Sequence, residues 1–520
     1  MSPISIVPEV IATINDLSTF APHTATSVFA IVTTASKGVV DTRTLITSEA
    51  QLISTFGPPV SEEGTTHYGI LAGIHYLKYG RQLWVVRVAD YNVAASRTIN
   101  NAAGANVSLT VTAATTGSHG NNIRVITSAG SRQGYKMVIQ YRIKSTSAWT
   151  TVETHDNLLL GTANASNEDY IETRLNGISN WISVTDTATQ TTLEATTTKL
   201  SGGDDGASVS ASDYVGVRSG LTVTGLQLYA NKEDLAINML AVPGETSSTV
   251  ISAMATVAEA RNDCIYLVDT PSGLSVTDAV DFINGDNTDD ASYPNATLND
   301  WRGVAYYPWV DYADGYSGST ITCPPCGFAA GIMALTDKER DPWFAPAGPN
   351  RGILRLADDI EYNMTDGEHE FAGPIVGGAG ANNLNPIRNI DGVGIVIWSQ
   401  ITLQRKSSTL RDVNVVRMLL YAMKSISTAV KGLQFDPNDA TLWRAIERVI
   451  NPELRAIKGR RGIYDYRVVC EEIMEERSDL VDNKTVLAQI FLKPTRAAEV
   501  ITLEFTPLSS GAEFDLFTEA

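Results

Sequence analysis

Two cysteines at close spacing are the residues of this chain best suited to chemistry. Cys323 and Cys326 flank two prolines, after a strand-like stretch and before a helical one. Redox chemistry would use the lowered thiol pKa that a helix N-terminus provides. The two prolines also favour a helix start by themselves. A zinc site would need a second pair, and Cys264 and Cys470 lie far off in the sequence. We therefore interpret the motif as the start of a helix.

Other stretches that look like functional motifs lack the residues those motifs require. The glycine-rich segment 373–380 has no Lys-Ser or Lys-Thr pair, so it is not a P-loop. Three aspartates in one loop lack the spacing and final glutamate of an EF-hand: Asp286, Asp289 and Asp290. The six histidines are scattered, and no G-x-S-x-G nucleophile motif occurs. We expect no catalytic residues, no metal site and no cofactor, and hence no enzyme.

Composition indicates a large folded protein with an acidic surface. The chain has 520 residues, 43% of them hydrophobic, and a net charge of −19. This length is too great for one hydrophobic core and suggests about three domains. The charge argues against nucleic acid as a partner. No run of 18 or more apolar residues predicts a membrane span, and the N-terminus lacks the features of a signal peptide. We expect synthesis in the cytoplasm and no stable membrane insertion.

Strand-like and helical patterns alternate through much of the chain, which favours an open, largely parallel α/β sheet. Between about residues 96 and 225, Thr, Ser, Ala, Asn and Gly dominate and short alternating runs recur, which predicts an inserted, mostly-β domain. An α+β pattern closes the chain. The predicted organisation is an N-terminal arm (1–20), an α/β core (21–95 and 226–400), the β-rich insertion (96–225), an α+β domain (401–506) and a C-terminal arm (507–520).

The predicted helix Thr441 to Lys458 has a basic face. Its apolar residues recur at i, i+4, i+7 and i+8, so they form one stripe that faces the domain core. Four basic residues fall on another face, where like charges repel unless a partner offsets them: Arg444, Arg448, Arg455 and Lys458. A solvated helix face explains this pattern equally. The alternative is a docking face for an acidic partner.

Several segments together resemble the sheath proteins of bacteriophage contractile tails. The C-terminal domain carries VVRMLLYAMKSI, FDPNDATLW, YRVVCEE and LKPTRAAEVITLEFT, after GVGIVIWSQITL at Gly392. A second marker is CGFAAGIMALTDKERDPWFAPAGPNRGIL, and the N-terminal region adds GRQLWVVRVAD. The resemblance covers roughly residues 20–95 and 320–506. The β-rich insertion resembles no family that we can name.

The resemblance implies a structural subunit of the virion, assembled in the host cytoplasm. Subunits of such sheaths stack as sixfold rings in a helical array around an inner tail tube, and they contract to drive the tube through the target cell envelope. The implied partners are further copies of this chain, the tail tube protein, and baseplate and tail terminator proteins. On this interpretation, the basic face of the Thr441 to Lys458 helix contacts the tube. The alternatives are a static tail-tube or capsid protein and, less favoured, a Rossmann-like enzyme.

The two ends of the chain are candidate arms that link subunits. A segment that adds a strand to a neighbour's sheet edge keeps two copies connected while their bodies rotate. Residues 2–15 and the segment after Pro507 have loosely alternating apolar residues suited to this pairing. The residues expected to make the contact are Ile4, Ile6, Val7, Val10, Ile11, Phe514, Leu516 and Phe517.

Overall fold

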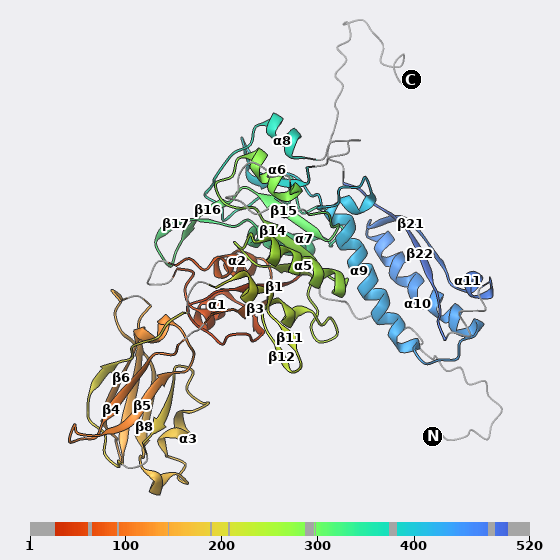
Figure 1. Ribbon diagram of the computed structural model, residues 1–520. Coiled ribbons are helices and arrows are strands. Elements are labelled where there is room, and N and C mark those ends of the chain that lie inside the picture. Colours follow the sequence, from red (N-terminus) through yellow and green to blue (C-terminus); the bar gives the residue numbers. More distant parts are fainter. Residues whose placement is uncertain are drawn as a thin grey trace, which may run out of the picture.

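The structure is a computed structural model that describes most of the chain (Figure 1). The described residues are 27–60, 65–90, 93–143, 145–187, 190–205, 209–285, 296, 298–373, 382–476 and 484–497. Both candidate arms and the three aspartates of the loop at 286–290 lie outside these residues, as does most of the glycine-rich segment.

An eight-stranded sheet forms the centre of the molecule. Its five inner pairings are parallel, and only the edge strands run antiparallel to their neighbours. Inner strands such as β1 and β14 are buried along their whole length, as expected for parallel strands covered on both faces. The order is β2 (Thr44–Ile46), β3 (Gln82–Arg87), β1 (Val28–Thr33), β13 (Met239–Ala241), β14 (Ile265–Asp269), β15 (Gly303–Tyr307), β19 (Leu384–Ile390) and β20 (Gly394–Ile397).

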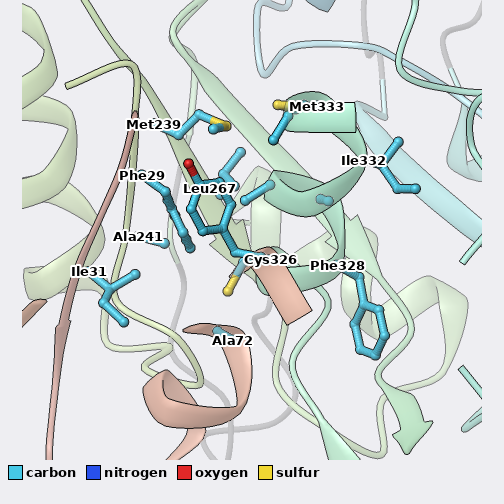
Figure 2. Close-up of a cluster of buried hydrophobic side chains, with 14 of the residues drawn as sticks. Phe29, Ile31, Ala72, Met239, Ala241, Leu267, Cys326, Phe328, Ile332 and Met333 are labelled. Atoms are coloured by element: carbon cyan, nitrogen blue, oxygen red, sulfur yellow. The ribbon is translucent and has the colours of Figure 1, made fainter. Parts of the chain in front are cut away.

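Helices cover both faces of this sheet and create two apolar cores. Successive residues of a strand point to opposite faces, so Phe29 enters one core and Ala30 the other. The first core contains α1 (Glu49–Phe56), α2 (Tyr68–Leu77) and α7 (Cys326–Glu339), and the second contains α5 (Ser248–Arg261) and α6 (Val276–Asn284). Figure 2 shows Phe29 and Leu267 of the sheet beside Met333 of α7.

Small residues bring α2 and α7 into close contact. A Cβ atom added at Gly327 would lie 2.4 Å from the Cα of Ala72, a separation that real Cβ atoms do not reach. Ala72 and Cys326 are both drawn in this contact in Figure 2. The small-residue run at the start of α7 therefore serves helix packing. Helix α7 begins at Cys326 with Pro325 as its N-cap residue, so the Cys-Pro-Pro-Cys motif starts a helix as predicted.

Two antiparallel sheets enclose a separate apolar core between β3 and β13 in the sequence, and they stand apart from the central sheet in Figure 1. The sheets are β4-β5-β9 and β10-β6-β7-β8. Their strands are β4 (Ser96–Asn100), β5 (Val107–Ala113), β6 (Ile123–Ala129), β7 (Tyr135–Tyr141), β8 (Thr150–Leu158), β9 (Ile182–Asp186) and β10 (Thr197–Lys199), with helix α3 (Ile171–Leu175).

The β-rich region ends earlier than its composition suggests. Its apolar core runs to Leu200. Beyond it, Tyr214 and Val215 of α4 (Ala211–Val215) pack against the core on the α5 side of the central sheet. The polar composition of residues 209–225 therefore reflects surface position and not membership of the β-rich region. The other predicted domain limits stay predictions.

A helical and β-ribbon unit follows the central sheet. It comprises α9 (Val413–Val430), α10 (Ala440–Gly459), β21 (Ile463–Val469), α11 (Glu471–Glu476) and β22 (Gln489–Pro494). One end of α9 enters the first core through Val413, Val416 and Leu420, and further along it packs with α10. The remaining elements are β11 (Arg218–Ser219), β12 (Thr222–Val223), β16 (Val310–Asp314), β17 (Ser319–Cys323), β18 (Asp359–Ile360) and α8 (Asp366–Ala372).

This architecture is a mixed α/β fold with several cores, which confirms the predicted class at that level. The arrangement of the domains, and the terminal arms in particular, stays a prediction.

Replacing His75 is expected to make the protein less sensitive to acid. His75 of α2 is 1% exposed and stacks on Phe328, with 3.8 Å between ring centroids. Burial lowers its pKa from 6.5 to about 3. Between these values the unfolded chain binds a proton that the folded chain does not, so stability falls as pH falls. The original chain should therefore lose about 2 kcal/mol more of its free energy of unfolding than His75→Met does when the pH falls from 7.5 to 5.

Urea unfolding of both proteins at the two pH values measures this difference, in which the contributions of all other titrating groups cancel. An equal stability difference at pH 7.5 and at pH 5 would show that the His75 pKa is not lowered.

Candidate assembly interface

The two-stranded ribbon β21-β22 lies against α10 with one side and leaves the other side open. The two strands pair antiparallel, with Tyr466 opposite Leu492 and Arg467 opposite Phe491. Tyr466 and Leu492 pack on the apolar core beneath, whereas the Phe491 side chain is 56% exposed. Within the described residues, this sheet has only two strands, so each strand has one edge without a ladder partner. Unpaired strand edges are templates for pairing with another chain.

Helix α10 packs against the inner side of this ribbon. Asp439 caps its N-terminus by accepting hydrogen bonds from the backbone N–H groups of Thr441 and Leu442, both at 3.0 Å. A stripe of apolar residues faces inward, as the periodicity predicts: Leu442, Ile446, Ile450, Leu454 and Ile457 are all buried. Glu447 then accepts from the N–H of Cys470 at 2.7 Å, which ties the end of β21 to the helix.

The structure divides the predicted basic face of α10 into two halves. Nε of Arg444 donates to the carboxylate of Glu471 at 2.7 Å, and Nζ of Lys458 lies 2.8 Å from Asp465. Arg448 and Arg455 are exposed, and neither forms an ion pair with any residue that the structure describes. The four residues are therefore not equally available to a partner, and the role of this face stays a prediction.

Three cations spaced seven residues apart, two on α9 and one at the residue that follows its last turn, fasten this unit to the part of the chain around the central sheet. Arg417 makes two hydrogen bonds to the Asp337 carboxylate, at 2.8 and 2.7 Å, and their side chains are only 5% and 1% exposed. Lys424 lies 3.7 Å from Asp263. Lys431 pairs with Glu233 at 2.6 Å in an exposed position. Sequence analysis missed this set, although a seven-residue spacing on a helix places all three cations on one face.

The two cysteines of the Cys-Pro-Pro-Cys motif are buried thiols. Burial raises the pKa of both Cys323 and Cys326 above the usual thiol range, and the Asp269 carboxylate raises that of Cys326 further. The backbone N–H of Cys326 donates to Asp269 at 2.9 Å. These thiols are the opposite of the exposed, low-pKa thiols that redox chemistry requires.

The described part of the chain contains neither a cluster suited to a metal ion nor a helix suited to a membrane. No group of three or more His, Cys, Asp or Glu side chains in that part of the chain is placed to hold a metal ion. No helix there is both long and apolar enough to cross a membrane.

The unit that contains α9, α10 and the ribbon matches a known family. Residues 405–506 match the model of the phage tail sheath C-terminal domain. This part of the chain is similar to a phage tail sheath domain. The match confirms the resemblance predicted from the sequence, and the open ribbon and the α10 face lie within the matched residues.

Proteins that match a larger part of the chain are tail sheath proteins. The tail sheath protein of Vibrio phage KVP40 is 28% identical over 335 residues, which are 60% of this chain and 47% of that protein. The chain thus spans about half the length of this relative.

Two solved structures share the fold. The sheath tail protein of Listeria innocua has a TM-score of 0.58 at 15% identity, over 90% of this chain and 95% of that one. The sheath complex of an extracellular contractile injection system, PVC, in its contracted state has a TM-score of 0.53 at 15% identity, over 97% of this chain and 98% of that one. At these identities the likeness shows the fold alone.

Proposed function

We propose that this chain is the structural subunit of a contractile sheath. Its copies stack as sixfold rings in a helical array around an inner tail tube, and the array contracts to drive the tube through the target cell envelope. The observation that carries the proposal is the sheath domain at residues 405–506. The partners are further copies of this chain, the tube protein, and baseplate and terminator proteins at the two ends. The assembly forms in the host cytoplasm and becomes part of the virion.

The edges of the β21-β22 ribbon that have no partner among the described residues are the sites at which copies link. A heterologous contact that does not close on itself builds a helical array, and a strand added at a sheet edge supplies such a contact. The donor segments are residues 2–15 and the segment after Pro507. Because backbone hydrogen bonds carry the contact, it survives when the bodies of two subunits turn relative to one another.

The work of contraction comes from packing. Many copies assemble in a metastable arrangement and pass to a better packed one. The small free energy that each subunit releases adds up along the sheath. This mechanism needs subunits that move as stiff bodies. The buried Arg417–Asp337 pair, which joins α9 to α7, supports that stiffness.

Electron microscopy of the purified chain in negative stain tests the proposal. Hollow striated cylinders are expected at concentrations where the protein pellets in the ultracentrifuge. Discrete globules at every concentration would favour an enzyme, and smooth tubes or closed shells would favour a static tube or capsid protein.

Charge reversal at Arg448 and Arg455 is expected to weaken assembly on the tube and to spare polymers formed without it. These two side chains are exposed and form no ion pair in the described part of the chain. A contact that must release during contraction suits ion pairs of about 1 kcal/mol or less each. Arg448→Glu with Arg455→Glu should therefore reduce decoration of purified tubes, and raising salt should reproduce part of the loss.

Arg444→Glu with Lys458→Glu provides the matched control, because Arg444 and Lys458 already pair with Glu471 and Asp465 in their own subunit. This control makes the same change of net charge and should decorate tubes better than Arg448→Glu with Arg455→Glu does. Normal decoration by the Arg448 and Arg455 variant at low salt would mean that this helix face is only solvated.

A further inference from the structure

A basic patch lies on the outer side of the four-stranded sheet in the β-rich region. The register aligns Lys199 of β10, Arg124 of β6 and Gln140 of β7 in one row across the sheet. Their chain neighbours Val125 and Ile139 point into the apolar core, so the row faces outward. Arg142, which follows β7, extends the patch at the same end of the sheet. We call Arg124, Arg142, Lys199 and Trp149 the basic patch.

Trp149 holds the two arginines together. The guanidinium carbon of Arg124 lies 4.4 Å from the centre of the Trp149 ring, and that of Arg142 lies 4.6 Å from it. Both guanidiniums lie within the roughly 6 Å at which an aromatic ring attracts a cation, and the two charges are no more than about 9 Å apart. This attraction offsets part of the repulsion between two like charges.

Neutral side chains fix both guanidiniums through their Nε atoms. Nε of Arg124 donates to Oε1 of Gln140 at 2.7 Å, and Gln140 in turn donates to Thr151 at 3.0 Å. Nε of Arg142 donates to Oδ1 of Asn122 at 3.2 Å. Among the residues that the structure describes, no carboxylate forms an ion pair with Arg124, Arg142 or Lys199. The patch is thus preorganised and keeps N–H groups available for an anion, and a planar carboxylate suits such groups.

The charge of the rest of the chain identifies the partner. Residues 96–200 contain eight Lys and Arg against seven Asp and Glu, a net charge of +1. Because the whole chain has a net charge of −19, the rest of the chain carries −20. Acidic bodies of neighbouring copies repel one another, and a basic patch on a region that stands apart from the body relieves this repulsion where it touches the next copy. From this complementarity we infer that the basic patch docks on the acidic body of a second copy of this chain. The inference rests on the proposed polymerisation.

Double charge reversal tests the patch. Arg124→Glu with Arg142→Glu should raise the protein concentration needed for cylinders about tenfold and should reduce the dependence of this concentration on salt. The matched control is Arg132→Glu with Arg174→Glu, which makes the same change of charge at exposed positions of the β-rich region outside the patch. The control should shift the concentration by less than about threefold.

Cross-linking locates the partner. A carbodiimide joins lysine amines to carboxylates in direct contact, and cylinders grown from mixed light and ¹⁵N-labelled chains separate links between copies from links within one. Links from Lys199 to acidic residues outside 96–200 of another copy are expected.

If the double variant needs the same protein concentration for cylinders as the unaltered chain, with the same salt dependence, the inference is overturned and the proposed function is left standing. Absence of cylinders from the unaltered chain would instead contradict the proposed function. If the double variant polymerises normally but no longer binds dextran sulfate, the patch serves an anionic polymer and the inference is wrong.

Discussion

A chain that lacks residues 2–15 is expected to fold and to stay mostly monomeric. In the described part of the chain the apolar cores begin at Val28, so the deletion removes no residue of these cores. It does remove the segment that we propose pairs with the β21-β22 ribbon of a neighbour. At about 0.5–1.5 kcal/mol net for each backbone hydrogen bond, four or five bonds contribute several kcal/mol to every contact. Because each contact repeats along the polymer, their loss decides whether cylinders form.

Sedimentation velocity and microscopy measure the assembly, and circular dichroism checks the fold. A variant with Ile4, Ile6 and Ile11 changed to Val keeps the apolar pattern and should form cylinders, whereas a scrambled arm of the same composition should fail as the deletion does. Cylinders of normal length from the truncated chain would show that this segment does not link subunits.

Arg417→Met is expected to destabilise the protein by about 3–5 kcal/mol, because it removes the cation from a buried carboxylate. The Asp337 side chain is 1% exposed, and Arg417 contacts it through two hydrogen bonds. The energy of the pair itself is modest, since both groups lost their hydration on folding. The large cost arises from leaving one charge in the interior without the other.

Denaturant midpoints measure this loss of stability. One further variant serves as a comparison, and a second substitution tests whether the loss can be recovered. Lys431→Met breaks a pair whose side chains are 55% and 61% exposed, so it should cost less than about 1 kcal/mol. Combining Arg417→Met with Asp337→Asn should recover much of the loss, since no full charge then stays buried. If Arg417→Met and Lys431→Met destabilise equally, the buried pair does not anchor α9.

The long helices of the sheath domain were predictable because their apolar periodicity is strong. The pattern predicted a helix from Thr441 to Lys458, and α10 runs from Ala440 to Gly459. Short strands were harder. The pattern of Lys484 to Leu492 predicts a strand over those residues, yet β22 spans Gln489–Pro494. Periodicity over a few residues cannot separate a paired strand from an extended loop, since pairing depends on where the partner strand ends.

The ion pairs could not be predicted from the sequence for a related reason. Arg417 and Asp337 are 80 residues apart, and only the docking of α9 on α7 brings them together. In the same way, the sequence pattern predicted the basic face of α10 but not which of its cations are paired. Arg444 meets Glu471, and Lys458 meets Asp465, only in the folded chain. The basic patch combines one residue each of β6 and β10 with Arg142 and Trp149, which flank β7 and β8, so no local sequence pattern predicts it.

Cryo-electron microscopy of cylinders at a resolution that traces the backbone would show whether terminal segments link the copies. We expect rings of six copies in a helical stack, with a terminal segment of a neighbouring copy added as a further strand to each β21-β22 ribbon. A discrete closed oligomer, or a helical array in which both edges of the ribbon face solvent, would contradict this expectation.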